Sequence, residues 1–258
     1  MKDKITSEGI SAILDTKIIG KNIVCLEEID STNNEAKRNS DMPDGTVFIA
    51  ELQTGGKGRL GRNWSSPKGV GAWFTILLKP DVSPENVSAI TLVAGLAVCK
   101  AIGGKIKYPN DIVIGTKKVC GILTELCAQI NTVNHVVCGI GINVNNDSFD
   151  DEIKNRATSI FIESGKKLSR SSIIAQVLTE FEPLYQSFLN NGLSEILEEY
   201  KSYCVTLNSY VTVTYQGNSI QGICRDILPD GSIVIDTGNE RLIINSGEVS
   251  VRGVYGYV

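Results

Sequence analysis

The chain has 258 residues, of which 42% are hydrophobic and 21% are charged, and its formal net charge is −4. A chain of this length and hydrophobic content can bury a large core in one or two domains. The slightly negative charge gives no general attraction for nucleic acid, so we expect no DNA partner. The single histidine, His135, excludes multi-histidine zinc sites and is expected to be a strand residue.

Neither export nor membrane insertion is expected. No apolar signal-peptide core follows the charged N-terminus. The apolar, uncharged run 86–99 has 14 residues, fewer than the roughly 20 apolar residues that cross a bilayer. The cysteines occur singly, without a C-x-x-C pair, which is typical of reduced, buried thiols in a cytoplasmic protein. They are Cys25, Cys99, Cys120, Cys127, Cys138, Cys204 and Cys224.

In chain order, an apolar strand leads into a helix that starts at Thr32, where Thr32 and Glu35 have capping-box spacing, and ends near Ser40. Apolar residues recur every three to four positions over 84–102, which predicts a buried helix. A second long helix is expected over 169–189, although Pro183 should kink or divide it. The expected strands are 22–29, 46–53, 72–78, 105–108, 112–114, 118–127 and 135–140, with a hairpin turn at Gly115-Thr116.

The pattern changes after Tyr203. Residues 210–252 contain five short β-like runs separated by turn sequences such as Pro229-Asp230-Gly231, without a helical period. This predicts a small β-barrel or sandwich appended to the chain. We therefore expect two domains, a ligand-binding domain over 1–205 and a β-domain over 206–258.

A glycine-rich, cationic segment at 53–64 is the most informative part of the chain. It contains four glycines interleaved with Lys57, Arg59 and Arg62. Glycine lets backbone N–H groups approach a ligand, and the cations supply the charge that phosphate oxygens attract. The segment therefore predicts a loop that closes on an anionic ligand.

Known phosphate-binding motifs do not account for this segment. Gly56, Gly58 and Gly61 match G-x-G-x-x-G, but Pro67 and later glycines interrupt the helix that a dinucleotide fold requires. A P-loop would need Lys-Ser or Lys-Thr where 62–63 is Arg-Asn. A kinase loop would need H-R-D and D-F-G downstream, and neither is present. A solvated surface loop remains the alternative for this segment alone.

A second group of polar residues follows at 107–111, Lys-Tyr-Pro-Asn-Asp. The proline fixes a rigid corner that presents Asn110 and Asp111, and Lys118, at the start of the next strand, is expected to face Asp111 across a short hairpin. A carboxylate that can hold Mg²⁺ and an ammonium that can meet an oxyanion are typical of phosphoryl or adenylyl transfer. A surface turn with a solvated lysine is the alternative.

Taken together, these motifs closely resemble the catalytic core of the bacterial biotin protein ligases, and the resemblance covers about residues 22–258. Six motifs occur in order, which makes chance agreement negligible. They are 30–33 (Asp-Ser-Thr-Asn), 53–59 with Arg62 and Trp64, 107–111, 118–121 (Lys-Val-Cys-Gly), 139–145 (Gly-Ile-Gly-Ile-Asn-Val-Asn) and 246–252 (Ser-Gly-Glu-Val-Ser-Val-Arg).

The resemblance implies an α+β fold, in which a mixed β-sheet catalytic domain related to class II tRNA synthetases precedes a C-terminal SH3-like barrel. It implies that biotin and Mg-ATP give biotinyl-5′-AMP, whose acyl group passes to a lysine of a biotin carboxyl carrier domain. ATP and Mg²⁺ would be the cofactors. The oligomeric state, including a homodimer, is left open.

Site residues are also implied by the resemblance, position by position. Catalytic roles would belong to Lys118, Arg59 and Asp111, and Asp111 would act at Mg²⁺. Biotin would be bound by Ser31, Thr32, Asn33, Gln53, Gly56, Arg59, Trp64, Lys118 and Gly121. The nucleotide would be bound by Lys57, Arg59, Arg62, Asn110, Asn143 and Arg252.

The sequence departs from the family pattern in the loop, where Lys57 and Leu60 replace two arginines, and at Tyr108, where tryptophan is usual. Only about twenty residues precede the first core strand, too few for the helix-turn-helix of repressor-type members.

Two alternative functions remain. A lipoate or octanoate ligase or transferase shares the fold, and a biotin-sensing transcriptional regulator would bind without turnover.

Overall fold

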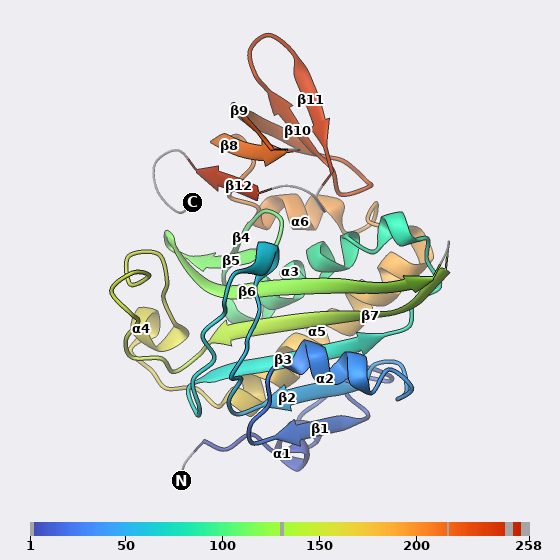
Figure 1. The fold of residues 1–258 in the computed structure, drawn as a ribbon, viewed down its shortest axis with the longest axis vertical. Helices are drawn as coiled ribbons and strands as arrows, with labels where there is room; N and C mark the ends of the chain where they lie inside the picture. Colours follow the sequence, from blue (N-terminus) through green and yellow to red (C-terminus); the bar gives the residue numbers. More distant parts are fainter. Residues whose placement is uncertain (1–2, 130–131, 216, 246–249, 254–258) are drawn as a thin grey trace.

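The computed structural model describes residues 3–129, 132–215, 217–245 and 250–253. The chain forms a seven-stranded mixed sheet and a smaller five-stranded sheet, which lie toward opposite ends of the long axis (Figure 1). The predicted α+β architecture with a C-terminal β-unit is confirmed. The domain limits 1–205 and 206–258 stay a prediction.

The larger sheet has the strand order β1-β2-β3-β7-β6-β5-β4. Its β1 and β2 run parallel and all other neighbours run antiparallel, so the sheet is mixed. The strands are β1 (Ile23–Leu26), β2 (Val47–Ala50), β3 (Gly71–Leu78), β4 (Lys105–Lys107), β5 (Asp111–Ile114), β6 (Lys117–Gln129) and β7 (Thr132–Asn143). The helices are α1 (Ser7–Ser11), α2 (Thr32–Arg38), α3 (Ala89–Ile102), α4 (Ile160–Ser164), α5 (Arg170–Asn191) and α6 (Leu197–Tyr203).

Strand β3 is buried along its whole length because helices cover both faces of the sheet. Successive side chains of a strand point to opposite faces. Accordingly Phe74 and Ile76 join the main hydrophobic core with α3 and α5, while Leu77 packs in a smaller cluster with Ala36 of α2 and Phe48 of β2. The face under α2 is only partly covered by this small cluster, and the remainder of that face carries the site described below.

The segment Pro84–Ile102 is, within the described residues, the only helical stretch long and apolar enough to span a membrane, with 19 residues and a mean hydropathy of 1.5. Ten residues of α3 are buried, from Ala89 to Cys99, and the helix packs against α5. The apolar composition is therefore explained by a position in the protein core.

The smaller sheet has the order β11-β10-β9-β8-β12 and is antiparallel throughout. Its strands are β8 (Tyr210–Tyr215), β9 (Asn218–Ile227), β10 (Ile233–Asp236), β11 (Arg241–Ile244) and β12 (Ser250–Gly253), which confirms the five predicted β-runs. Val211, Cys224 and Ile233 of this sheet belong to the same hydrophobic cluster as α3 and α5. The two sheets therefore share one continuous core.

Two local expectations need correction, and three short helices were not predicted. The N-cap of α2 is Ser31 rather than Thr32, and no side chain caps the helix, so the capping box is absent. Helix α5 continues through Pro183 as one element instead of dividing there. Short helices α1, α4 and α6 were missed because five to seven residues give too little periodicity to recognise.

The expectation of buried thiols also holds only in part. All seven cysteines are free and five are buried, but Cys25 is exposed on β1 and Cys127 is half-buried. Burial raises the pKa of Cys99 and that of Cys138 to about 12. Both thiols are therefore protonated at neutral pH and are poor nucleophiles.

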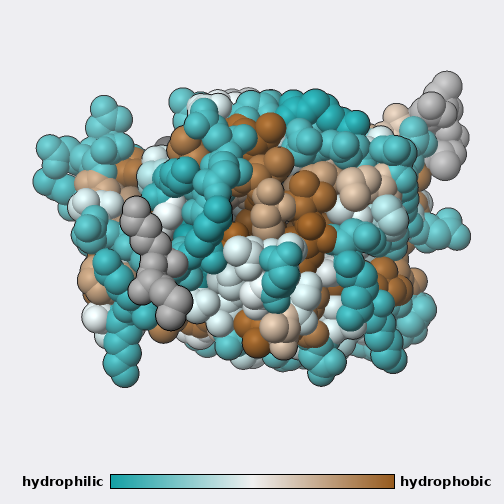
Figure 2. All heavy atoms as spheres, turned by 90° about the horizontal axis from the view of Figure 1, so that it is seen from below, coloured by the Kyte–Doolittle hydropathy of each residue, from teal (hydrophilic) through white to brown (hydrophobic). Residues whose placement is uncertain are grey.

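The end of the molecule that carries α1 and β1 shows hydrophobic atoms among hydrophilic ones (Figure 2). Exposed apolar side chains occur in the segment between α1 and β1, where Ile13 is 53% and Ile18 is 43% exposed. Scattered exposure of this kind is common on folded proteins.

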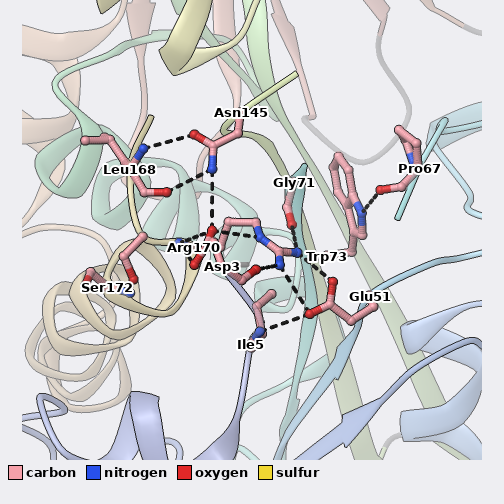
Figure 3. A network of polar contacts seen from close by, with 11 residues as sticks. Asp3, Ile5, Glu51, Pro67, Gly71, Trp73, Asn145, Leu168, Arg170 and Ser172 are labelled. Atoms are coloured by element: carbon pink, nitrogen blue, oxygen red, sulfur yellow. Dashed lines mark hydrogen bonds and ion pairs between the residues drawn. The ribbon is translucent and has the colours of Figure 1, made fainter. Parts of the chain in front are cut away.

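A buried arginine ties the N-terminal segment to the larger sheet (Figure 3). Arg170 is 1% exposed and donates from Nη1 to Glu51 Oε2 at 2.8 Å and from Nε to Asp3 Oδ2 at 3.0 Å. Its Nη2 also donates to the backbone oxygen of Asp3, and the Ile5 N–H donates to Glu51 Oε1 at 2.9 Å. Because Glu51 directly follows β2, this cluster fixes the strand end that leads to Gln53.

The substitution Arg170→Met is expected to lower the free energy of unfolding by about 3–5 kcal/mol, because it leaves the buried carboxylate of Glu51 without its partner. Urea denaturation of the full chain measures this. The matched control is Arg225→Met, which breaks an exposed ion pair with Asp236 and should cost much less. Equal losses for the two variants would contradict the assignment of Arg170 as the anchor.

Candidate functional site

A cavity lies on the α2 face of the larger sheet, between α2, the glycine-rich loop and the strands β6 and β7. It is narrow, with about 50 Å³ of free space. Its lining includes most of the residues that the sequence motifs indicated. The lining residues are Ser31, Thr32, Asn33, Gln53, Lys57, Gly58, Arg59, Trp64, Phe74, Asn110, Lys118, Gly121, Ile122, Leu123, Gly139, Ile140 and Gly141.

The floor of the cavity is bare backbone. Gly121 of β6 pairs directly with Gly141 of β7, and Gly139 lies two residues along the same face. A Cβ on Gly141 would stand 2.4 Å from Trp64 Nε1, and one on Gly139 would stand 2.2 Å from Asn33 Oδ1. Both separations are shorter than real Cβ contacts allow, so the cavity depends on glycine at these positions.

Trp64 lies across this floor. Its ring is 5.1 Å from Lys118 Nζ, measured to the ring centroid, and it packs edge-on against Trp73 at a centroid distance of 6.3 Å. Its indole Nε1 is buried and has no hydrogen-bond partner among the described residues. The ring therefore occupies part of the space between the glycine floor and the lysine.

One end of the cavity is polar. The Thr32 backbone N–H and hydroxyl both donate to Gln53 Oε1, at 2.8 and 3.1 Å, and Gln53 Nε2 donates to Ser66 Oγ at 2.8 Å. Ser31 is only 3% exposed, and because it does not cap α2 its hydroxyl is available on the cavity wall. Buried hydroxyl and amide groups of this kind favour a ligand with hydrogen-bonding groups of its own.

Asn33 lines the cavity, but its polar atoms bind the protein. Its Nδ2 donates to the Leu123 carbonyl at 3.2 Å and to Glu125 Oε2 at 2.7 Å, and its Oδ1 lies 2.6 Å from Thr75 Oγ1. Lys37 holds the same Glu125 carboxylate at 2.6 Å. The arrangement fastens α2 to the sheet, and the predicted contact of Asn33 with ligand stays a prediction.

The glycine-rich loop folds back on itself as a narrow hairpin. Gln53 and Ser66 form an antiparallel bridge, and Lys57 and Asn63 form another. A Cβ on Gly56 would stand 2.3 Å from the Trp64 carbonyl oxygen, so the close approach of the two arms requires glycine there. The tip is a short 3-10 helix, Arg59–Gly61.

The other end of the cavity is cationic. Lys118 Nζ lies 2.5 Å from Asp111 Oδ1, and both side chains are largely buried, which places the two groups face to face as predicted. Arg59 reaches from the loop to Asn110 Oδ1 at 3.1 Å. Burial lowers the pKa of Arg59, yet an arginine stays charged at neutral pH. The cationic groups of Lys118 and Arg59 therefore both lie at this end, where the loop approaches the corner formed by residues 107–111.

Two residues of the predicted nucleotide set lie away from the cavity. Arg62 is exposed on the outer arm of the loop and Asn143 is buried, donating to the Thr158 carbonyl at 3.0 Å; neither lines the cavity. The side chain of Arg252, and residues 246–249 of the last motif, lie outside the described residues. Their roles stay predictions.

Several residues that build the cavity have no site role predicted from the sequence. Ser66 and Thr75 hold Gln53, Thr32 and Asn33 in place, and Gly139 and Gly141 form the floor. The two-residue spacing of Gly139 and Gly141 within a strand could have indicated a bare sheet face. No local pattern marks Ser66 or Thr75, because their contacts are made across the fold.

The chain matches two protein families. Residues 25–143 match the biotin/lipoate A/B protein ligase family, and residues 206–252 match the C-terminal domain of biotin protein ligases. Both matches agree with the order of the two sheets along the chain.

Characterised relatives and solved structures agree with this. The bifunctional ligase/repressor BirA of Bacillus spizizenii is 34% identical over 91% of this chain and 75% of its own length. The biotin–[acetyl-CoA-carboxylase] ligase of Mycobacterium tuberculosis is 30% identical over 80% of this chain and 79% of its own. The biotin protein ligase of Aquifex aeolicus in complex with biotin and ATP superposes with a TM-score of 0.81 at 33% identity, covering 90% of this chain and 99% of that one.

The fold, the ordered motifs gathered around one cavity and these matches lead to a single conclusion: the chain belongs to the biotin protein ligase family.

Proposed function

We infer that this protein is an ATP-dependent biotin–protein ligase, which activates biotin as biotinyl-5′-AMP and transfers it to a lysine of a biotin carboxyl carrier domain. The observation that carries the inference is the single cavity in which Lys118 and Arg59 stand at one end and the Ser31–Gln53 polar group at the other. The functional names of the relatives agree with it.

Biotin matches the polarity of this cavity from end to end. Its ureido ring carries hydrogen-bonding groups suited to Ser31, Thr32 and Gln53, its apolar ring and tail suit the glycine floor beneath Trp64, and its carboxylate suits the cationic end. The ring of lipoate has no polar group that could bind the buried hydroxyl and amide groups at this end of the cavity. These groups would then be left without hydrogen-bond partners in the ligand. The polar end therefore favours biotin over lipoate or octanoate.

The first step joins two anions, so the protein must hold them together and offset their charge. A biotin carboxylate oxygen forms a bond to the α-phosphorus of ATP, and the bond to pyrophosphate breaks. Lys118 lies where it can meet both the carboxylate and the α-phosphate, and Arg59 can approach from the loop. Lys57, Arg62, Asn110, Asn143 and Arg252 are proposed for the nucleotide.

Mg²⁺ fits the site only as an ion that arrives with ATP. The described residues contain no group of three or more metal-binding side chains, and Asp111, paired with Lys118, is the carboxylate at this end. Magnesium is often held by one carboxylate together with substrate phosphates, where it neutralises phosphate charge. Asp111 is therefore the residue proposed to hold it.

In the second step the carrier lysine attacks the acyl carbon of the adenylate, and AMP leaves.

The ion pair of Lys118 and Asp111 favours an enzyme that turns over its substrate rather than a sensor that only binds biotin. The net charge of −4 favours a protein partner over DNA. The unpaired cysteines favour the cytoplasm, and a homodimer is left open.

Substituting Lys118 by alanine is expected to lower biotin-dependent exchange of pyrophosphate into ATP by about 100-fold or more, because a charge that stabilises the transition state is lost. The control is Lys117→Ala, on the neighbouring strand position, whose Nζ donates to the Lys154 carbonyl outside the cavity. Unchanged exchange in the Lys118 variant would remove this residue from the mechanism.

Gly141→Ala is expected to weaken biotin binding about tenfold or more, because the added methyl group overpacks the floor against Trp64. Titration calorimetry with biotin alone measures this. Gly95→Ala serves as the control, since its added Cβ in α3 would meet its nearest neighbour at an ordinary 3.9 Å. Wild-type affinity in Gly141→Ala would mean that biotin does not lie on this floor.

A further inference from the structure

Tyr108 is a buried link between the two sheets. It is 2% exposed, and its hydroxyl donates at 2.8 Å to the carbonyl of Gly231, in the turn between β9 and β10 of the smaller sheet. Its backbone N–H donates to Thr206 Oγ1 at 3.0 Å. Both partners follow the last residue of α6 in sequence, so a single residue of the connection between β4 and β5 is held at two points by the C-terminal part of the chain.

The acceptors on the C-terminal side are held firmly. Gly231 belongs to a closed turn in which its N–H donates to the Leu228 carbonyl and the Leu228 N–H donates to the Ser232 carbonyl, both at 2.8 Å. The Asp230 carboxylate accepts from the Ser232 N–H at 2.9 Å. Thr206 is 4% exposed. A tyrosine bound to such a turn follows any displacement of the smaller sheet.

The same residue begins the corner that carries the proposed nucleotide groups. Lys107 of β4 pairs with Asp111 of β5, so only Tyr108, Pro109 and Asn110 lie between them. Asn110 is fixed in turn by two hydrogen bonds to the Ile122 backbone, at 2.9 and 3.1 Å. A connection this short transmits a shift of Tyr108 to the next two residues.

We propose that Tyr108 is a positioning residue through which the C-terminal sheet sets the place of Asn110 and Asp111 for ATP. The inference rests on the proposed ligase function and deepens it. Binding of biotin alone depends chiefly on the loop and the glycine floor, whereas nucleotide binding depends on the corner. Loss of the hydrogen bond from Tyr108 to Gly231 should therefore weaken ATP binding more than biotin binding.

The variant Tyr108→Phe removes only the hydroxyl that binds Gly231. The matched control is Tyr185→Phe, because Tyr185 is also buried, at 1% exposure, and its hydroxyl has no hydrogen-bond partner among the described residues. Full-length proteins are compared in biotin-dependent pyrophosphate exchange at varied ATP, in calorimetry with biotin alone, and in thermal unfolding.

For Tyr108→Phe we expect the KM for ATP to rise about three- to tenfold, the effect of one lost hydrogen bond, while the Kd for biotin changes less than twofold. Tyr185→Phe should leave both values within twofold of wild type. A lower melting temperature without a rise in the KM for ATP would show a merely structural role and overturn the proposal, as would equal losses at biotin and ATP.

A second pair of variants keeps the test decisive if Tyr108→Phe does not fold. Thr206→Ala removes the other anchor and should also raise the KM for ATP, and Thr206→Ser, which retains a hydroxyl, should restore it. Failure of serine to restore the KM would contradict the link. Absence of exchange in the wild-type protein would instead refute the ligase function itself, so the two failures are distinguishable.

Discussion

A pair of glycines facing each other across two strands is the constraint on which the site depends. Gly121 and Gly141 leave part of the α2 face of the sheet without side chains, at the place where neighbouring stretches are filled by Phe48 and Leu77. Backbone hydrogen bonds keep this surface flat and rigid, so a ligand ring can lie directly on it. Any side chain at these positions would fill the cavity with protein.

The remaining parts of the site approach this floor from three directions. Helix α2 brings Ser31 and Thr32 to one end, and the corner between β4 and β5 brings Asn110 near the other. The loop hairpin closes above with Trp64 and Arg59. Helix α2 is held at the cavity wall by the hydrogen bond of Asn33 to Glu125, and the strand end that leads to the loop is held behind the cavity by Arg170 and Glu51. A polar end and a cationic end are thereby separated by an apolar middle.

Much of this could be predicted from the sequence. Lys118 and Asp111 were expected to face each other because a short hairpin permits few registers, and the structure places them 2.5 Å apart. The glycine-rich loop was expected to be a ligand loop because glycine lets the backbone approach a ligand and the cations attract an anion, and Lys57, Gly58 and Arg59 do line the cavity. The long helix α3 was predicted because apolar residues recur along its whole length, and ten of its 14 residues are buried.

Other features depend on tertiary contacts and could not be predicted. The buried cluster of Arg170, Glu51 and Asp3 joins residues far apart in the chain, and Thr75 contacts α2 only because β3 passes beneath it. Helix α2 lacks its expected cap, because Ser31 instead lines the cavity. Local preference was overridden there by the needs of the site.

The central claim is that biotin becomes an acyl-adenylate in this cavity. The most direct measurement is mass spectrometry of the ligand retained by the protein after incubation with Mg-ATP and either biotin or lipoate, without a carrier. We expect retained biotinyl-5′-AMP from biotin and little adenylate from lipoate. Retention of lipoyl-5′-AMP without biotinyl-5′-AMP, or of no adenylate at all, would contradict it.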